Sequence, residues 1–166
     1  MGDAVFLKAL TPEAQACLGA PRVKISMYPF RVGRESRVRH VHTSVDRRRW
    51  GTAHNNDLYL QETGKVLNIS REHFQIERRE DAYYLVDRGS ACGTLLEGIA
   101  IGGNRAGGQQ QLSNGDVIIV GTSESRHVFK FVIDGDKNNL TDSKIKIRSD
   151  GSKSRGKLLH YSCRSQ

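Results

Sequence analysis

The sequence has few cysteines and no long apolar run. Its three cysteines, Cys17, Cys92 and Cys163, are far apart and odd in number, and none belongs to a C-x-x-C motif. This spacing excludes a zinc ribbon and a thioredoxin-type redox pair, and it is typical of thiols in a reducing compartment. No stretch approaches the roughly 20 apolar residues that cross a bilayer. Residues 1–20 lack a basic leader and do not resemble a signal peptide, so we expect a cytoplasmic protein without a transmembrane segment.

Catalytic and metal-binding motifs are also missing. The glycine-rich segment 102–108 is not followed by Lys-Ser/Thr and a helix, which excludes a P-loop. His40, His42 and His54 would form a poor metal site, because the neighbouring arginines repel a cation. Neither paired carboxylates nor a Ser, His and Asp set occurs in a catalytic pattern. We therefore expect a protein that is not an enzyme and has neither a cofactor nor a metal.

The positive charge is concentrated near the C-terminus. The 166-residue chain has a formal net charge of +8. Residues 135–166 contain eight basic and three acidic residues, so they contribute +5 and the preceding 134 residues contribute +3. Because this segment is polar and lacks a core-forming pattern, we expect a flexible basic tail.

Short strands separated by turns are predicted for most of the remaining chain. Apolar and polar residues alternate with a period of two at 73–79 and 82–87, as a half-buried sheet requires. Segment 102–108 should be a loop, because glycine weakens strands and helices. The predicted strands are 4–7, 22–27, 30–34, 57–61, 73–79, 82–87, 94–96, 116–121 and 127–133, with a helix start at Thr11-Pro12-Glu13.

This pattern indicates an all-β fold: a β-sandwich of two mainly antiparallel sheets with functional loops at one end. We expect an N-terminal extension at 1–20, the β-sandwich domain at 21–134 and the tail at 135–166. A stretch of about twenty residues between 35 and 56 is too long for a turn, and long loops in compact domains are usually functional or disordered.

Four short motifs lie in the predicted loops or at strand ends. They are Gly33-Arg34, Ser70-Arg71-Glu72-His73, a segment from Asp87 that ends in Gly93-Thr94, and Asn114-Gly115-Asp116 before a late strand. Their order and spacing resemble the forkhead-associated (FHA) domain family over about residues 22–133. The resemblance implies an FHA/SMAD-like β-sandwich that binds a phosphothreonine peptide in a partner protein and serves a Ser/Thr kinase pathway.

The chemistry of these residues agrees with that expectation. A phosphothreonine carries about −1.5 to −2 charges and three strong acceptor oxygens, so its site needs fixed cationic donors and hydroxyl groups. Arg34, Ser70 and Arg71 supply such groups, and by resemblance they bind the phosphate. His73, by resemblance, stabilises the loops. We group Gly33, Gly93 and Thr94 with it as loop-structuring residues.

One position departs from the pattern of the family. Cys92 occupies the place of an asparagine that bonds to the peptide main chain in the family, and Ala91 precedes it where a neighbour helps to form the phosphothreonine pocket. Cysteine is a weak donor and acceptor. We therefore expect Ala91 and Cys92 to contact the phosphopeptide with an altered sequence preference.

Other binding functions stay open. The domain would also suit phosphate-independent docking, or capture of a phosphorylated segment of its own chain or a second copy, for which Thr11, Thr141 and Ser143 are candidate sites. The basic loop 37–49 and the tail could hold nucleic acid or an anionic surface through their charge. Only Trp50 and Tyr161 offer stacking there, so nucleic-acid contacts would be weak and nonspecific, and we do not expect nucleic acid as the partner.

Overall fold

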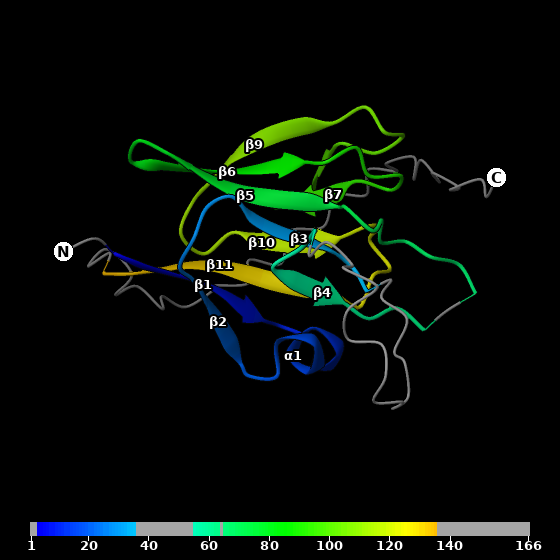
Figure 1. Cartoon of the computed structure of the whole chain (residues 1–166), viewed down its shortest axis with the longest axis horizontal. Helices are drawn as coiled ribbons and strands as arrows, with labels where there is room; N and C mark the ends of the chain where they lie inside the picture. The colour runs from blue at the N-terminus through cyan, green and yellow to red at the C-terminus, as the bar shows by residue number, and fades with distance from the viewer. Residues whose placement is uncertain (1–2, 36–54, 64, 136–166) are drawn as a thin grey trace, which may run out of the picture.

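The computed structural model describes residues 3–35, 55–63 and 65–135, which fold into two stacked sheets and one short helix (Figure 1). The helix is α1 (Pro12–Leu18). The strands are β1 (Ala4–Ala9), β2 (Arg22–Ile25), β3 (Phe30–Arg34), β4 (Leu58–Leu60), β5 (Phe74–Arg79), β6 (Ala82–Asp87), β7 (Thr94–Leu96), β8 (Ile99–Ile101), β9 (Gly108–Leu112), β10 (Val117–Val120) and β11 (Val128–Asp134).

Each sheet is mainly antiparallel. The six-stranded sheet has the order β2-β1-β11-β10-β7-β8, and the five-stranded sheet has the order β4-β3-β5-β6-β9. Among the described residues, the strand pairs are antiparallel except for β3 with β4, which run in the same direction. The predicted all-β sandwich is therefore confirmed, and the two faces between its sheets form the core.

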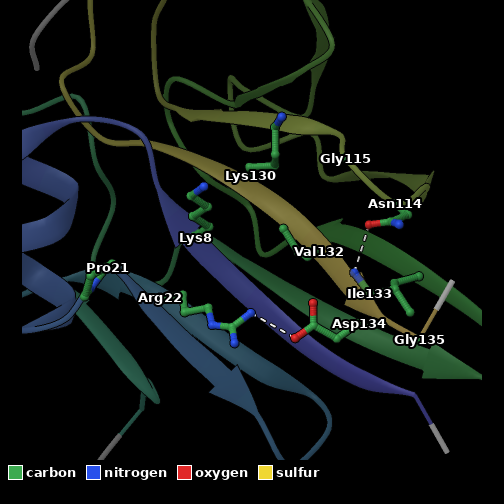
Figure 2. A pocket seen from close by; sticks show the side chains of 10 residues that line it. All are labelled: Lys8, Pro21, Arg22, Asn114, Gly115, Lys130, Val132, Ile133, Asp134 and Gly135. Carbon is green, nitrogen blue, oxygen red and sulfur yellow. Dashed lines mark hydrogen bonds and ion pairs between the residues drawn. The ribbon is translucent and has the colours of Figure 1, made fainter. Parts of the chain in front are cut away.

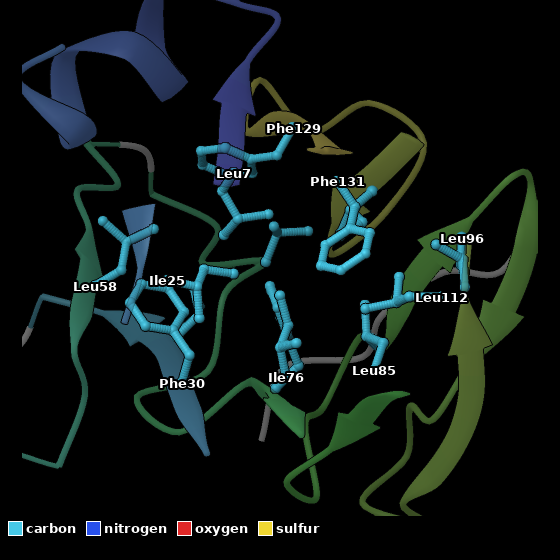
Figure 3. Close-up of a cluster of buried hydrophobic side chains, with 14 of the residues drawn as sticks. Leu7, Ile25, Phe30, Leu58, Ile76, Leu85, Leu96, Leu112, Phe129 and Phe131 are labelled. Carbon is cyan, nitrogen blue, oxygen red and sulfur yellow. The ribbon is translucent and has the colours of Figure 1, made fainter. Parts of the chain in front are cut away.

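The core is built from the alternate residues of the strands. Leu7, Phe129 and Phe131 of the six-stranded sheet are fully buried against Ile76 and Leu85 of the five-stranded sheet (Figure 3). Burial of each such side chain stabilises the fold by roughly 1.5–3 kcal/mol relative to exposure. This core holds the ends of the described strands in place.

The helix begins where the sequence predicts. The Thr11 hydroxyl accepts a hydrogen bond from the Ala14 N–H at 3.3 Å, and Pro12 needs no N–H partner at the first helical position. Gly19 ends the helix with a positive φ of 66°. No helix in the described part of the chain is long and apolar enough to cross a membrane.

The segment 1–20, predicted as an extension, takes part in the sandwich. Strand β1 lies between β2 and β11 and pairs with both, so residue 21 does not mark an edge of the fold. Two strands were not predicted. β8 has only three residues, and β9 begins at Gly108, inside the predicted loop, and continues with three glutamines that have little strand preference. The predicted tail beyond 135 and most of the basic loop lie outside the described residues.

Candidate functional site

Arg34 ends β3 at one end of the sandwich and is tied to the segment before β5. Its backbone N–H donates to the Ser70 carbonyl at 2.9 Å, and its side-chain Nε donates to the Ile69 carbonyl at 2.9 Å. The two terminal guanidinium nitrogens have no partner among the described residues. Arg34 therefore presents two oriented donors at this end of the molecule.

Gly33 permits the close approach of these two segments. A Cβ atom at this position would lie 2.0 Å from the Arg71 carbonyl oxygen and 2.7 Å from Nδ2 of Asn56. Both distances are below any ordinary contact, and the nearest obstacle is backbone. Only glycine lets β3 pass this close to Arg71, which places Arg34 beside Ser70.

Asn56 fixes the backbone at Arg71. Its buried side chain donates from Nδ2 to the Arg71 carbonyl at 2.7 Å and accepts at Oδ1 from Arg88 at 2.7 Å. Arg88 also pairs with Glu72 at 3.1 Å. Burial lowers the pKa of Arg88, and the Glu72 carboxylate opposes this shift. The backbone carbonyl of Arg71 is thus held in place. The exposed guanidinium of Arg71 has no partner within the described part of the chain.

His73 connects the two loops of the site. Its Nδ1 accepts from the Ser70 N–H at 2.9 Å, and its Nε2 lies 2.7 Å from the Gly93 carbonyl. The ring is fully buried, and this burial lowers the pKa of His73. A neutral ring protonated at Nε2 satisfies both contacts, because Nδ1 then accepts and Nε2–H donates.

The second loop follows β6 and is organised by Asp87. The carboxylate accepts from the N–H groups of Gly89 and Ser90, both at 2.9 Å, and from the Ser90 hydroxyl. The Ser90 hydroxyl in turn accepts from the Gly93 N–H at 2.9 Å. Asp87 and Ser90 are buried, and their bonds close a compact turn between β6 and β7.

The two loops meet at Ser70. Its Oγ accepts from the Ala91 N–H at 3.0 Å, so the hydroxyl proton is left to donate to a ligand. Ala91 is exposed and Cys92 half-buried in the same turn. Gly93 has a positive φ of 74°, and the Thr94 hydroxyl is buried without a hydrogen-bond partner in the described structure. The predicted residues of both loops are therefore brought together.

Two supporting features were missed in the sequence. Glu62 accepts from the N–H groups of Asn68 at 2.7 Å and Ile69 at 3.0 Å, which holds the chain just before Ser70. The glycine-rich loop 102–107 docks on the turn that carries Cys92, because its N–H groups at 104 and 105 donate to the carbonyls of Ala91 and Ser90 at 2.8 and 2.9 Å. An acidic residue in a loop, or a run of glycines, gives no indication of such contacts.

The other candidate residues do not join this site. Thr11 caps α1 and donates its hydroxyl to the Arg126 carbonyl, so a phosphate on Thr11 would have to break that bond. His40, His42, His54, Thr141 and Ser143 lie outside the described residues. Among the residues that the structure describes, no group of three or more His, Cys, Asp and Glu could hold a metal ion.

Solved structures of FHA domains share this fold. The kinase-interacting FHA domain of the kinase associated protein phosphatase of Arabidopsis is 22% identical with a TM-score of 0.52, over 81% of this chain and 97% of that domain. The FHA domain of an Arabidopsis thaliana hypothetical protein is 19% identical with a TM-score of 0.50, over 80% and 86% of the two chains. EmbR of Mycobacterium tuberculosis, solved in complex with a low affinity phosphopeptide, is 19% identical with a TM-score of 0.50, over 79% of this chain and 24% of EmbR.

The sequence itself matches a family model. The model of the FHA domain matches residues 30–121, which is more than half of the chain and includes both loops of the site. No curated protein is detectably similar in sequence.

Proposed function

Because this chain belongs to the FHA domain family, we propose that it is a phosphothreonine-dependent protein–protein interaction module in Ser/Thr kinase signalling. Its ligand would be a phosphorylated segment of a partner protein. The observation that carries this proposal is the Arg34 guanidinium, which is anchored through Nε at Ile69 while its two terminal nitrogens have no partner in the described structure.

Arg34, Ser70 and Arg71 would divide the phosphate oxygens among them. The anchored guanidinium would donate in a forked manner, the Ser70 hydroxyl would donate its proton, and the exposed Arg71 would close over the dianion. Hydrogen bonds to charged groups contribute roughly 1.5–3 kcal/mol each. After association and ordering costs, three of them fit a dissociation constant on the order of micromolar.

The turn with Ala91 and Cys92 would contact the peptide main chain beside the phosphothreonine. It adjoins the phosphate-binding residues through the bond between Ala91 and Ser70. A thiol at position 92 donates and accepts weakly. We therefore expect Cys92→Asn to strengthen peptide binding and to change the residues preferred after the phosphothreonine.

Arg34→Ala tests the proposal directly. Fluorescence anisotropy at two salt concentrations measures the binding of three ligands: a phosphothreonine peptide library, the same library without phosphate, and single-stranded DNA. We expect binding that depends on the phosphate and survives moderate salt. Arg34→Ala should weaken this binding by about 10- to 100-fold. Arg105→Ala, which removes an exposed cation from the neighbouring glycine-rich loop, should bind as the unchanged chain does.

Two results would overturn the assignment. One is a folded Arg34→Ala variant with full phosphopeptide affinity. The other is salt-sensitive DNA binding without any phosphopeptide signal, because that would identify counterion release as the source of affinity. Thermal unfolding of each variant shows whether a loss of binding reflects the site or the fold.

A further inference from the structure

Three cations lie side by side on the outer face of the six-stranded sheet, away from the loops described above. In the strand register Lys8 of β1 lies opposite Arg22 of β2 on one side and opposite Lys130 of β11 on the other. Lys8 and Arg22 are exposed and Lys130 is half-buried. We call Arg22, Lys8 and Lys130 the cationic row.

The fold does not explain this row. Like charges directly opposite each other destabilise a sheet. Arg22 is compensated by Asp134 at 2.9 Å, whereas neither lysine has a counterion among the described residues. Figure 2 shows the Lys8 and Lys130 side chains on neighbouring strands, with the Arg22 guanidinium turned toward Asp134. An anion that binds between the two lysines would supply the missing charge.

The three side chains of the cationic row line a hollow on this face. It has a volume of about 510 Å³, and its lining includes all three cations, Asn114, Val132 and the Asp134 carboxylate that pairs with Arg22 (Figure 2). The Asn114 side chain accepts at Oδ1 from the Ile133 N–H at 2.9 Å, which fixes the amide beside the hollow. The site therefore combines positive charge with an amide and an apolar wall, as an acidic ligand with apolar groups would require.

An apolar row continues from the hollow across the same face. It consists of one residue from each of four neighbouring strands, each opposite the next in the register: Val128 of β11, Ile119 of β10, Leu95 of β7 and Ala100 of β8. They point outward, because their chain neighbours Phe129, Ile118 and Leu96 are buried. Val128 lies two residues before Lys130 on β11, which is a separation of roughly 7 Å. We call these four residues the apolar row.

We propose that this face binds an acidic, amphipathic segment of a partner protein. Carboxylates of that segment would lie on the cationic row while its apolar side chains cover the apolar row. Complementary charge gives such contacts their specificity and register. The segment following residue 135 of this chain is a poor occupant, because it carries a charge of +5 and the cationic row would repel it. The binding is independent of the phosphothreonine loops, so both surfaces could be occupied together.

A synthetic peptide tests the proposal on the full chain. The probe is an unphosphorylated, fluorescent 18-residue peptide with glutamates along one helical face and leucines along the other, measured at low salt. A helix of this length extends about 27 Å. One twin replaces glutamate by lysine, and another replaces leucine by serine. We expect anisotropy to report binding of the probe, and both twins to bind at least about tenfold more weakly.

Variants locate the binding. Lys8→Glu should weaken probe binding by about tenfold or more, since a carboxylate at position 8 would pair with Arg22 and Lys130 and repel the probe. The same carboxylate favours folding, so we do not expect Lys8→Glu to lose its structure. The double variant Lys8→Gln/Lys130→Gln removes both charges without adding a negative one, and it should also weaken probe binding. Ile119→Thr, which keeps a branched side chain on the apolar row, should also weaken binding.

Matched controls separate this surface from the rest of the molecule. Arg78→Glu makes the same change of charge on the exposed end of β5 in the other sheet, and it should leave probe binding unchanged. Arg34→Ala should also leave it unchanged. The proposal is overturned if the probe does not bind, if Lys8→Glu and the double Gln variant bind it as the unchanged chain does, or if Arg34→Ala abolishes binding.

Discussion

The loop end of the sandwich and the outer face of the six-stranded sheet both present cations, but they hold them differently. Arg34 and Arg88 at the loop end are anchored by neutral carbonyl or amide oxygens at 2.9 and 2.7 Å. Lys8 and Lys130 on the sheet face are positioned only by strand register, and each has a flexible stem. The first arrangement is preorganised for one anion, whereas the second can adapt to several.

This difference predicts which kind of substitution abolishes binding in each region. Preorganised donors lose little conformational entropy on binding, so their affinity depends on the backbone that aims them. Lysines on flexible stems contribute mainly charge, which salt screens over about 8 Å at physiological ionic strength. Backbone changes should therefore be most damaging at the loop end, and charge changes should be the sensitive test at the sheet face.

The largest expected effect is that of Gly33→Ala. The new methyl group would meet the Arg71 carbonyl at 2.0 Å, so β3 and the loop before β5 must separate. We expect a loss of about 3 kcal/mol in the free energy of unfolding, and loss of phosphopeptide binding even where the variant is folded. Urea unfolding and peptide anisotropy measure the two effects.

A second glycine provides the comparison for this variant. Gly89 has a positive φ of 79°, and a Cβ atom added there would meet no atom within 4 Å, so Gly89→Ala adds backbone strain without a collision. The expected cost is about 1–2 kcal/mol. Equal destabilisation by the two variants would show that the close approach at Gly33 is not what positions Arg34.

His73→Ala should have the next largest effect. It leaves the Ser70 N–H and the Gly93 carbonyl without their common partner, which should lower the free energy of unfolding by about 2 kcal/mol and weaken phosphopeptide binding. Ile76→Val is the matched control, because it should cost about 1 kcal/mol in the core while leaving binding intact. A folded His73→Ala chain with unchanged affinity would contradict the role of the ring in joining the loops.

Much of the loop end could be predicted from the sequence, because its signals are local. The bounds of β3 and β6 follow from alternation and flanking turns. Arg34 was expected at the end of a strand and Ser70 before the next strand, and both lie there. Glu62 could not be found in this way, since its bonds to Asn68 and Ile69 depend on how one loop curls.

The sheet face could not be predicted, because it depends on distant pairing. Lys8 and Lys130 are 122 positions apart in the chain, and no sequence pattern states that β1 lies against β11 with these two residues opposite each other. β9 was missed for a related reason: its glutamines have little strand preference and are ordered by pairing with β6. Register is a tertiary property, and the cationic row exists only through it.

Acid should weaken the fold before carboxylates begin to titrate. Burial lowers the pKa of both His73 and His127 below the value of about 6.5 in the unfolded chain. The unfolded state then binds more protons below pH 6.5, so the free energy of unfolding should be constant above that pH and fall as the pH drops below it.

Urea unfolding at pH 7.5, 6.5 and 5.5 measures this dependence. His127→Gln removes one of the two contributions and should flatten the decline without abolishing it, because His73 of the loop end remains. A free energy of unfolding that rises between pH 6.5 and 5.5 would show that a histidine is stabilised as a cation in the folded state.

The smallest expected effect is an increase in stability, and it concerns the sheet face. Lys8→Glu replaces two like-charge contacts by two opposite-charge contacts with Arg22 and Lys130, so the free energy of unfolding should rise by about 0.5 kcal/mol at low salt. Lys24→Glu is the control, because Lys24 lies on β2 opposite Phe6 and meets no cation directly across the sheet. Its stability should stay within about 0.3 kcal/mol of the unchanged chain, and the difference between the variants should shrink in high salt.

The sign of this change decides how the sheet face is understood. If Lys8→Glu stabilises the fold while it removes binding of the acidic peptide, the lysine at position 8 is unfavourable for folding and favourable for binding, which is what an interaction surface requires. If the free energy of unfolding of Lys8→Glu equals or falls below that of Lys24→Glu, water screens the cationic row enough to remove its repulsion. The contrast between anchored cations at the loop end and opposed cations on the sheet would then carry no functional meaning.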